Sequence, residues 1–447
     1  MRKIIVILLL LVFILTSIAT LFGQTKINPL DIKERTLKNG LKVVSVQDNA
    51  SPTVSIHVWY NVGGKNDPQG RSGFAHMFEH MMFKSTKNMP NEKMDRLTED
   101  VGGFNNASTW DDFTNYYEVV PSNHLETLLW AESERMINLN VDEKNFASER
   151  DVVKEEFRQS VLAQPYGRFY EFINSLSYQK HPYKRGVIGN LDELSAATTK
   201  DANEFYKTFY RPDNAYLIVV GDFDQKQFDA WTGKYFGRIQ KPSGSVPRVT
   251  EIEPERTGEI RHQTTAPNVP FPAVAITFLA PDSKSADVPA LRIAETILSG
   301  GESSRLYQEL VYKQQLAQEA SFNAEIRVDR GLLTFSAIAS EGKTAEELEK
   351  SLLAELKKSQ DAPVSAKELE KAKNQLVMRK LKELETNDGR AIAIERAIAY
   401  QGDPKAVNSD IQKLQAVTAA DVQRVMKKYF TDKNRVVIYY QQEGAKK

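Results

Sequence analysis

The sequence predicts an α+β protein made of two homologous domains, each a mainly antiparallel sheet packed against helices. Strand patterns alternate with groups of helical patterns twice along the 447 residues. A helix-then-strand unit at residues 190–214 recurs at residues 410–434. Between the two copies, residues 241–258 are rich in Gly, Pro and Ser, as interdomain linkers are. Together these three observations predict the fold class.

The recurring unit matches without gaps at an offset of 220 residues, 410 minus 190. Each copy has a Thr suited to cap a helix, and each leads through an aromatic pair into a β-branched strand. Chance similarity between two amphipathic units is the competing interpretation, but it rarely gives identities spread over the whole segment. The identical pairs are Leu194/Leu414, Ala196/Ala416, Thr198/Thr418, Asp201/Asp421, Lys207/Lys427 and Asn214/Asn434.

Local patterns define the elements of the first domain. Asn39-Gly40 between alternating apolar residues is typical of a β-hairpin turn. Further along the chain, apolar residues recur with the period of a helix or cluster in β-branched runs. The predicted elements are the opening of a β-hairpin at residues 36–46, strands at residues 55–62 and 214–220, and helices at residues 73–83, 125–139 and 142–162.

The predicted domain organisation follows from the repeat and the linker. The first domain occupies residues 25–240 and the second occupies residues 261–447. Residues 241–260 form the linker, which is long and polar enough to act as a hinge.

Composition excludes several functional classes. The 59 basic residues balance 59 acidic ones, so no basic stripe favours nucleic acid, and we expect no nucleic-acid partner. Cysteine is absent, which excludes disulfides, a thiol nucleophile and a Cys-type zinc site. Any metal site must therefore use His, Asp or Glu.

Residues 1–24 resemble a targeting segment. The basic start Met1-Arg2-Lys3 precedes the apolar residues 4–15, as in a secretory signal, and Ser17-Ile18-Ala19 or Gly23-Gln24 would serve as the cleavage site. The alternative is an uncleaved anchor, because residues 4–23 carry no charge and are long enough to tether the chain to a membrane. In a bacterium, either form predicts an exported protein, periplasmic or anchored facing the periplasm.

The segment FAHMFEHMMF, residues 74–83, predicts a metal site. On a helix, His76 and His80 lie one turn apart on the same face, so both imidazoles can reach one ion. Glu79 leans to the side, where it can act as a general base on a metal-bound water. The alternative is an ordinary core helix, but burying two imidazoles and a carboxylate without partners costs several kcal/mol.

Residues 146–157 offer the third ligand. Glu149 and Glu156 are seven apart and share a helix face with Val152 and Val153, a combination that predicts an inward-facing surface. We therefore assign Glu156 as the ligand and Glu149 as a catalytic-site partner that holds a histidine or the metal-bound water. Glu155 points away and is predicted to be solvated. One Zn²⁺ is the expected ion, although Mn²⁺ and Co²⁺ accept the same ligands.

The string His76-Met77-Phe78-Glu79-His80, followed by Glu149 and Glu156, resembles the inverzincin metallopeptidases of the pitrilysin, insulin-degrading enzyme and mitochondrial processing peptidase group. Similarity to this group covers nearly everything after the targeting segment. Further matching stretches are residues 102–117, 181–189, 210–222 and 300–310.

The resemblance implies a zinc endopeptidase. The two domains would form half of a clam-shell chamber that admits peptides or unfolded polypeptides, and Glu79 would activate the zinc-bound water. Residues 102–109 would be an edge strand that pairs with the substrate backbone, with Asn106, Ala107 and Thr109 binding substrate near the scissile bond. The second domain would carry no zinc ligands.

One departure from the family pattern concerns the second domain. Self-sufficient members carry there an Arg and, seven residues later, a Tyr that stabilise the developing oxyanion. Residues 310–318 place Val311 and Gln318 at these positions, and Tyr312 could serve only after a shift in register. The resemblance therefore implies a homologous partner subunit, in a heterodimer or a homo-oligomer. The alternatives are a non-catalytic structural subunit and a specific presequence-processing peptidase.

Two further signals have ordinary structural interpretations. His57 alternates with apolar residues on a strand, which favours a packed rather than a catalytic histidine. Asp111-Asp112 could bind a cation, but the favoured interpretation is a solvated loop.

Overall fold

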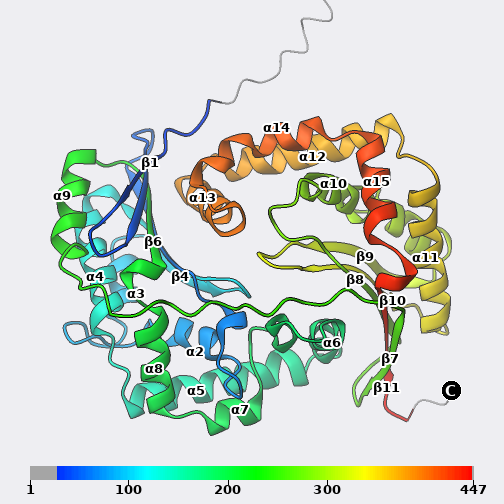
Figure 1. Ribbon diagram of the computed structural model, residues 1–447, viewed down its shortest axis with the longest axis horizontal. Helices are drawn as coiled ribbons and strands as arrows, with labels where there is room; N and C mark the ends of the chain where they lie inside the picture. Colours follow the sequence, from blue (N-terminus) through cyan, green and yellow to red (C-terminus); the bar gives the residue numbers. More distant parts are fainter. Residues whose placement is uncertain (1–27, 445–447) are drawn as a thin grey trace, which may run out of the picture. The chain divides into compact units, whose positions relative to one another are not determined.

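The computed structural model of this chain describes residues 28–444 (Figure 1). The predicted signal or anchor at residues 4–23 lies outside the described residues. From Ile32 onward the described residues form one compact unit. Within residues 28–444, no helix combines the length and the apolar composition that crossing a bilayer requires.

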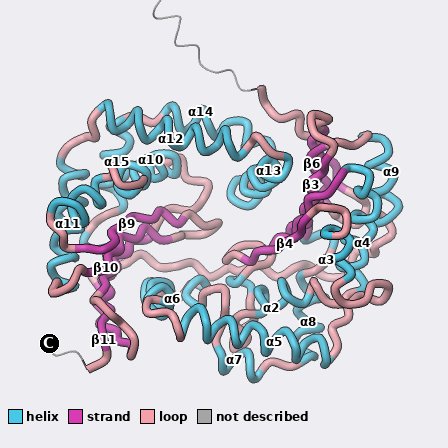
Figure 2. Tube along the Cα trace, turned by 180° about the vertical axis from the view of Figure 1, so that it is seen from behind, coloured by secondary structure: helices cyan, strands magenta, loops and turns pink. Residues whose placement is uncertain are grey.

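Two sheets organise this unit, each with helices packed beside it (Figures 1 and 2). The strands of the first sheet, in spatial order, are β1 (Lys33–Thr36), β2 (Lys42–Gln47), β6 (Ala215–Gly221), β3 (Thr53–Tyr60), β5 (Thr114–Pro121) and β4 (Phe104–Thr109). Those of the second are β7 (Ile260–Ala266), β11 (Arg435–Gln442), β8 (Ala273–Leu279), β10 (Leu332–Ala339) and β9 (Ala317–Glu325).

Helices fall into two sets that follow the two sheets along the chain. The α-helices of the first half are α2 (Phe74–Met81), α3 (Lys93–Glu99), α4 (Leu125–Asn138), α5 (Glu143–Phe157), α6 (Gly167–Ser177), α7 (Leu191–Ala196), α8 (Thr199–Phe209) and α9 (Gln225–Tyr235). Those of the second half are α10 (Val288–Ser299), α11 (Ala345–Asp361), α12 (Ala366–Glu383), α13 (Asn387–Gln401), α14 (Asp410–Ala416) and α15 (Ala419–Tyr429).

The two sheets repeat one topology. In the first, β2 and β6 are parallel and every other neighbouring pair is antiparallel. In the second, β7 and β11 are parallel and the remaining pairs are antiparallel. The order β2-β6-β3-β5-β4 thus corresponds to β7-β11-β8-β10-β9. The prediction of two α+β halves with mainly antiparallel sheets is confirmed.

The sequence repeat extends to single hydrogen bonds. Thr198 and Asp201 form a capping box at the start of α8, and Thr418 and Asp421 form the same box at the start of α15. The amide of Asn214 donates to the Phe209 carbonyl at 2.9 Å, and that of Asn434 donates to the Tyr429 carbonyl at 2.9 Å. Identical residues at the offset therefore make identical local contacts.

The linker between α9 and β7 has no regular secondary structure, but its later part is firmly held. Glu253 is buried and accepts three backbone N–H groups from residues 179–181 at 2.8–3.0 Å. Arg256 is buried as well and donates to the carbonyls of Ser177, Thr277 and Asn434. These bonds leave the linker less freedom than its polar composition indicates.

The loop at Asp111-Asp112 is not solvated, so that prediction is wrong. Asp112 is buried and accepts hydrogen bonds from the Tyr183 hydroxyl at 2.5 Å and from the Val328 amide at 3.0 Å. Asp111 forms an ion pair with Arg327 at 3.2 Å. Because Arg327 and Val328 lie between β9 and β10, this loop joins the two halves.

A second buried contact between the halves surrounds His57 on β3. Its Nδ1 lies 2.9 Å from Oε1 of Glu395 and its Nε2 lies 3.1 Å from Oδ1 of Asp388, both on α13. The other Glu395 oxygen accepts a hydrogen bond from the Asn115 amide at 2.9 Å. Burial alone would lower the pKa of His57, but Glu395 and Asp388 outweigh it and raise the pKa to about 9. His57 is therefore packed, as predicted, and also charged.

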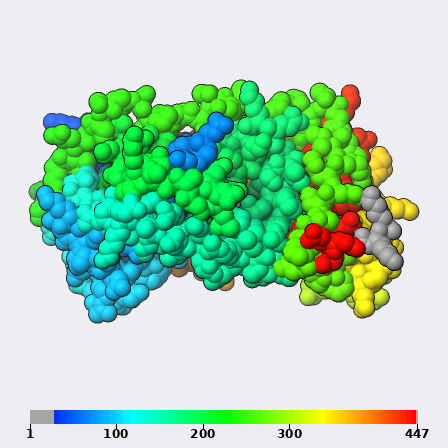
Figure 3. Space-filling view, turned by 90° about the horizontal axis from the view of Figure 1, so that it is seen from below, coloured from blue at the N-terminus to red at the C-terminus, as the bar shows by residue number. Residues whose placement is uncertain are grey.

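A third contact between the halves is made by α6 of the first half, which packs on the second sheet. The Tyr440 hydroxyl of β11 donates to the carbonyl of Pro165, just before α6, at 2.9 Å. Phe169 of α6 stacks at a tilt on the Tyr440 ring, with centroids 5.5 Å apart. Figure 3 shows this side of the molecule, with teal residues of the α6 region beside the lime-green and red residues of β7 and β11.

Candidate metal centre

Helix α2 places the two histidines of the HMFEH string. It begins after Gly73, whose φ of 89° is accessible mainly to glycine. The buried carboxylate of Asp67 accepts the backbone N–H groups of Gly73 at 2.6 Å and Ala75 at 2.8 Å, and so satisfies two amides at the helix start. Apolar residues of α2, including Phe78, pack in the core of the first half, which leaves His76 and His80 on the other face.

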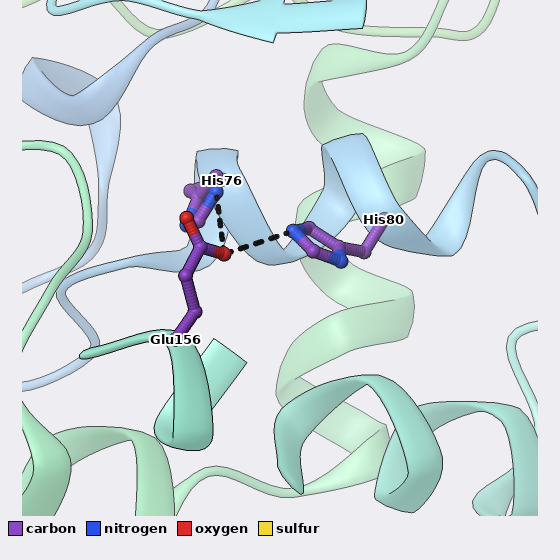
Figure 4. Close-up of side chains that lie close together, drawn as sticks. All are labelled: His76, His80 and Glu156. Carbon is purple, nitrogen blue, oxygen red and sulfur yellow. Dashed lines mark ion pairs between the residues drawn. The ribbon is translucent and has the colours of Figure 1, made fainter. Parts of the chain in front are cut away.

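Both imidazoles point at Glu156 of α5. The Nε2 atoms of His76 and His80 lie 3.6 Å and 3.5 Å from Oε2 of Glu156 (Figure 4). Tetrahedral zinc with bonds of about 2.0–2.1 Å needs donor atoms roughly 3.3 Å apart, so this spacing fits the ion. Among residues 28–444 these three side chains are the one His, Asp and Glu group whose donor atoms all lie within 4.8 Å of one another.

Glu149 lies behind His80, on the side away from Glu156. Its Oε2 is 3.7 Å from Nδ1 of His80, while its Oε1 is 2.6 Å from Nζ of Lys84 and 3.0 Å from the Ser148 hydroxyl. Burial alone would raise the pKa of Glu149, but His80, Lys84 and Ser148 outweigh it and hold the pKa below the ordinary value. Glu149 is therefore an anion that faces the far nitrogen of a metal-facing imidazole.

The helix face that carries Glu149 and Glu156 differs from the prediction. Val153 and Glu149 are buried, but Val152 is 46% exposed and the Glu156 side chain is 45% exposed. The inference that both valines face inward is wrong for Val152. Glu156 instead lies at the rim, where its carboxylate faces the histidines and stays open to solvent. Glu155 is exposed, as predicted.

Glu79 is half-buried, and its carboxyl group interacts electrostatically with His80 and Glu156. Burial raises the pKa of its carboxyl group, and the Glu156 charge adds to this rise. Hydrogen bonds from Thr109, at the end of β4, and the charge of His80 act in the opposite direction. A carboxylate with a raised pKa is a better proton acceptor, which suits a general base.

The two imidazoles differ as proton acceptors. Burial and the neighbouring His80 lower the pKa of His76 to about 4, so His76 is neutral at neutral pH. Burial alone would lower the pKa of His80 too, but the carboxylates of Glu149, Glu79 and Glu156 outweigh it and raise the pKa above 6.5. His80 therefore holds a proton more readily than an ordinary imidazole does, and this proton competes with a metal for Nε2.

We predict that zinc affinity falls as the pH drops below neutral. A ligand with a raised pKa competes for protons against the metal, so each pH unit below the His80 pKa should weaken zinc binding by about tenfold. Chelator competition at several pH values measures this dependence. An affinity that stays constant between pH 5 and pH 8 would contradict the protonation of His80.

The predicted substrate strand is β4, which lies at the edge of the first sheet. Asn106 is exposed, Ala107 is buried and Thr109 is half-buried. The Ala107 amide donates to Oδ1 of Asn106 at 2.8 Å. Substrate binding by these residues stays a prediction.

The second half has no cation or phenol at the two positions noted in the sequence. Val311 packs against the core of the second half, and Gln318 is exposed and donates to the Ala339 carbonyl at 2.9 Å. Tyr312 is 70% exposed and lies on the π-helix Tyr307–Lys313. A π-helix is a local change of helical register. Tyr312 nevertheless lies one residue after position 311, where the family pattern has Arg.

Two residues of the site were not predicted. Asp67 lies nine residues before His76, and only its place before Pro68 and Gly70 indicates a turn. Lys84 follows His80 by four residues and lies just after α2, where a lysine is usually solvated.

Comparisons with known proteins identify the family. The model of Insulinase (Peptidase family M16) matches residues 42–190, and that of Peptidase M16 inactive domain matches residues 196–376. Zinc protease PqqE of Helicobacter pylori is 32% identical over 407 residues, which cover 90% of this chain and 91% of that protein. The probable mitochondrial-processing peptidase subunit beta of Arabidopsis thaliana is 24% identical over 408 residues, covering 89% and 76% of the two chains.

A solved structure agrees with these matches. The crystal structure of a protease from Helicobacter pylori aligns with a TM-score of 0.89 at 31% identity, covering 93% of this chain and 100% of that one. The resemblance found in the sequence motifs is confirmed, and relatives of this chain are named zinc proteases. The chain is a member of peptidase family M16, the insulinase family.

Proposed function

We propose that this protein is a zinc endopeptidase that cleaves peptides or unfolded polypeptides. The observation that carries the proposal is the convergence of His76 Nε2 and His80 Nε2 on the Glu156 carboxylate at 3.6 Å and 3.5 Å, with Glu79 beside them. Two imidazole nitrogens and one carboxylate are a protein donor set of catalytic zinc sites, in which water takes the fourth position.

Each residue of the site has a role in the proposed reaction. His76, His80 and Glu156 would hold the metal. When bound, Zn²⁺ supplies a Lewis acid that polarises the scissile carbonyl and makes water more acidic. Glu79 would take a proton from the attacking water and return it to the leaving amine. Glu149 would keep the His80 ring oriented by accepting its Nδ1–H.

The edge of β4 would hold the substrate. An extended peptide can add to a free sheet edge through main-chain hydrogen bonds, which bind many sequences with little discrimination between side chains. Asn106, Ala107 and Thr109 are the residues proposed to make this contact. The Ala107 amide already has an acceptor in Asn106, so the Asn106 side chain would have to move before a peptide could pair at that position.

A homologous partner subunit would complete the oxyanion site. Val311 and Gln318 cannot donate hydrogen bonds in the way of Arg and Tyr, and the loss of one oxyanion donor typically costs about a hundredfold or more in rate. The relative from Arabidopsis thaliana is named as a subunit, which supports this proposal. Residues 1–24 support export of the chain to the periplasm.

The test is hydrolysis of a quenched fluorescent peptide library by the exported chain, alone and mixed with a homologue that carries the Arg and Tyr but lacks zinc ligands. We expect the mixture to cleave at least a hundredfold faster than the chain alone. N-terminal sequencing of the protein from the periplasmic fraction would show whether residues 1–24 are removed.

Other outcomes separate the alternatives. Equal hydrolysis rates for the chain alone and for the mixture would overturn the partner proposal but not the proposed peptidase activity. Bound zinc without hydrolysis in any mixture would favour a non-catalytic subunit. Cleavage restricted to presequence-like peptides would favour a processing peptidase.

A further inference from the structure

Lys84 is a charged residue at the metal centre to which neither the motif nor the proposed reaction assigns a role. It follows α2, four residues after His80, and its side chain is 26% exposed. Its Nζ lies 2.6 Å from Oε1 of Glu149, whose other oxygen faces Nδ1 of His80 at 3.7 Å. The three groups thus form a row from the lysine through the carboxylate to the imidazole.

We propose that Lys84 is a positioning residue for the metal centre, which acts by fixing the Glu149 carboxylate so that its Oε2 faces His80. The inference rests on the proposed zinc site. A carboxylate held at one oxygen cannot turn freely, so the other oxygen stays in place as the acceptor for Nδ1–H. A carboxylate oxygen facing Nδ1 at 3.7 Å favours the His80 tautomer that carries its proton on Nδ1 and leaves Nε2 free to bind the metal.

The other contacts of Glu149 do not replace Lys84. Ser148 also donates to Oε1, at 3.0 Å, but it precedes Glu149 on the same helix and moves with it. Lys84 is attached to α2, the helix of the two histidines, whereas Glu149 belongs to α5. The ion pair therefore sets the position of the carboxylate relative to the imidazole, which Ser148 cannot do.

A second effect of Lys84 has the opposite sign, and this makes the proposal testable. A positive charge near the site repels Zn²⁺, so removal of the charge alone would strengthen zinc binding. Loss of an outer partner of a metal-bound histidine instead weakens metal binding by about 10- to 100-fold. The sign of the change in zinc affinity distinguishes a positioning role from a purely electrostatic one.

The experiment compares Lys84→Met with Lys84→Arg in the full chain. Met has nearly the same shape but no donor, whereas Arg keeps both the donor and the charge. Zinc affinity is measured by competition with a chelator of known affinity, and the visible spectrum of the Co²⁺-loaded protein reports coordination number. We expect Lys84→Met to bind zinc 10- to 100-fold more weakly and Lys84→Arg to bind it within about threefold of wild type.

Arg71→Met is the matched control. Arg71 lies just before α2 and pairs with Asp201 of α8 at 2.9 Å, with both side chains 29% exposed. Its loss removes a comparable ion pair beside the same helix without touching Glu149. Thermal midpoints of both Met variants measure the structural cost of losing each pair.

The outcomes separate this inference from the proposed function. Unchanged or tighter zinc binding by Lys84→Met would overturn the positioning role, as would equal weakening in Arg71→Met. Failure of the wild-type chain to bind zinc would overturn the metal centre itself. Weaker binding in Lys84→Met alone, with a changed Co²⁺ spectrum and rescue by Arg, is the result that the geometry predicts.

Discussion

Replacement of Glu79 by Gln is expected to lower peptide hydrolysis by two to four orders of magnitude while zinc stays bound. The amide keeps the size of the carboxylate but cannot accept the proton of the attacking water, and general-base catalysis typically contributes about 10²- to 10⁴-fold. The three proposed ligands are untouched by the change. Steady-state hydrolysis of a fluorescent peptide, together with metal analysis of the same samples, measures both quantities.

Glu155→Gln provides the matched control. Glu155 is an exposed carboxylate next to Glu156 and pairs with Arg158 at 3.2 Å. Its hydrolysis rate should stay within about twofold of wild type, because surface ion pairs contribute little. If Glu79→Gln retained most of its activity, Glu79 would not be the base. If that variant lost its zinc, the carboxylate would belong to the metal ligands instead.

Replacement of His57 by Leu is expected to lower the free energy of unfolding by about 3–5 kcal/mol. The ring is fully buried between Glu395 and Asp388, and its loss leaves a buried carboxylate without its cation. The midpoint of urea unfolding measures the change. Lys357→Met is the control, because it removes an ion pair with Asp361 in which the two side chains are 67% and 58% exposed. We expect this variant to lose less than about 1 kcal/mol of unfolding free energy.

The same histidine gives the stability a pH dependence of known sign. The folded-state pKa of His57 is about 9, above the ordinary value of 6.5. The contribution of the charged His57 to the free energy of unfolding is therefore fully present below pH 6.5 and is lost as the pH rises through 9. A pKa rise of this size corresponds to roughly 3 kcal/mol of stabilisation of the folded state. Urea midpoints that were flat from pH 6.5 to pH 10, or equal in His57→Leu and wild type, would show that the imidazolium does not hold the halves together.

Much of the fold follows from local sequence. The capping boxes at Thr198 and Thr418 lie within a few residues of the helices that they start, and the repeat at an offset of 220 residues requires two similar halves. The HMFEH string likewise depends only on helical spacing, so His76 and His80 could be placed without knowledge of the tertiary structure.

What could not be predicted depends on contacts between distant residues. His57 and Glu395 are 338 positions apart, and no local pattern relates a buried histidine to its partner on another element. Asp112 is a similar case, since its burial depends on Val328 in the second half. The exposure of Val152 reflects the position of α5 at the rim of the metal centre, which helical periodicity does not determine.

The turn that follows β4 has an entropic consequence for binding. Asp111 and Asp112, directly after this edge strand, are held by Arg327 and Val328 of the second half. Ordering one backbone residue costs about 1–2 kcal/mol. Because this end of the edge strand is already fixed, a peptide that paired with it would bear most of the ordering cost itself. Peptides that are stiff and extended before they bind therefore lose the least conformational entropy at this edge.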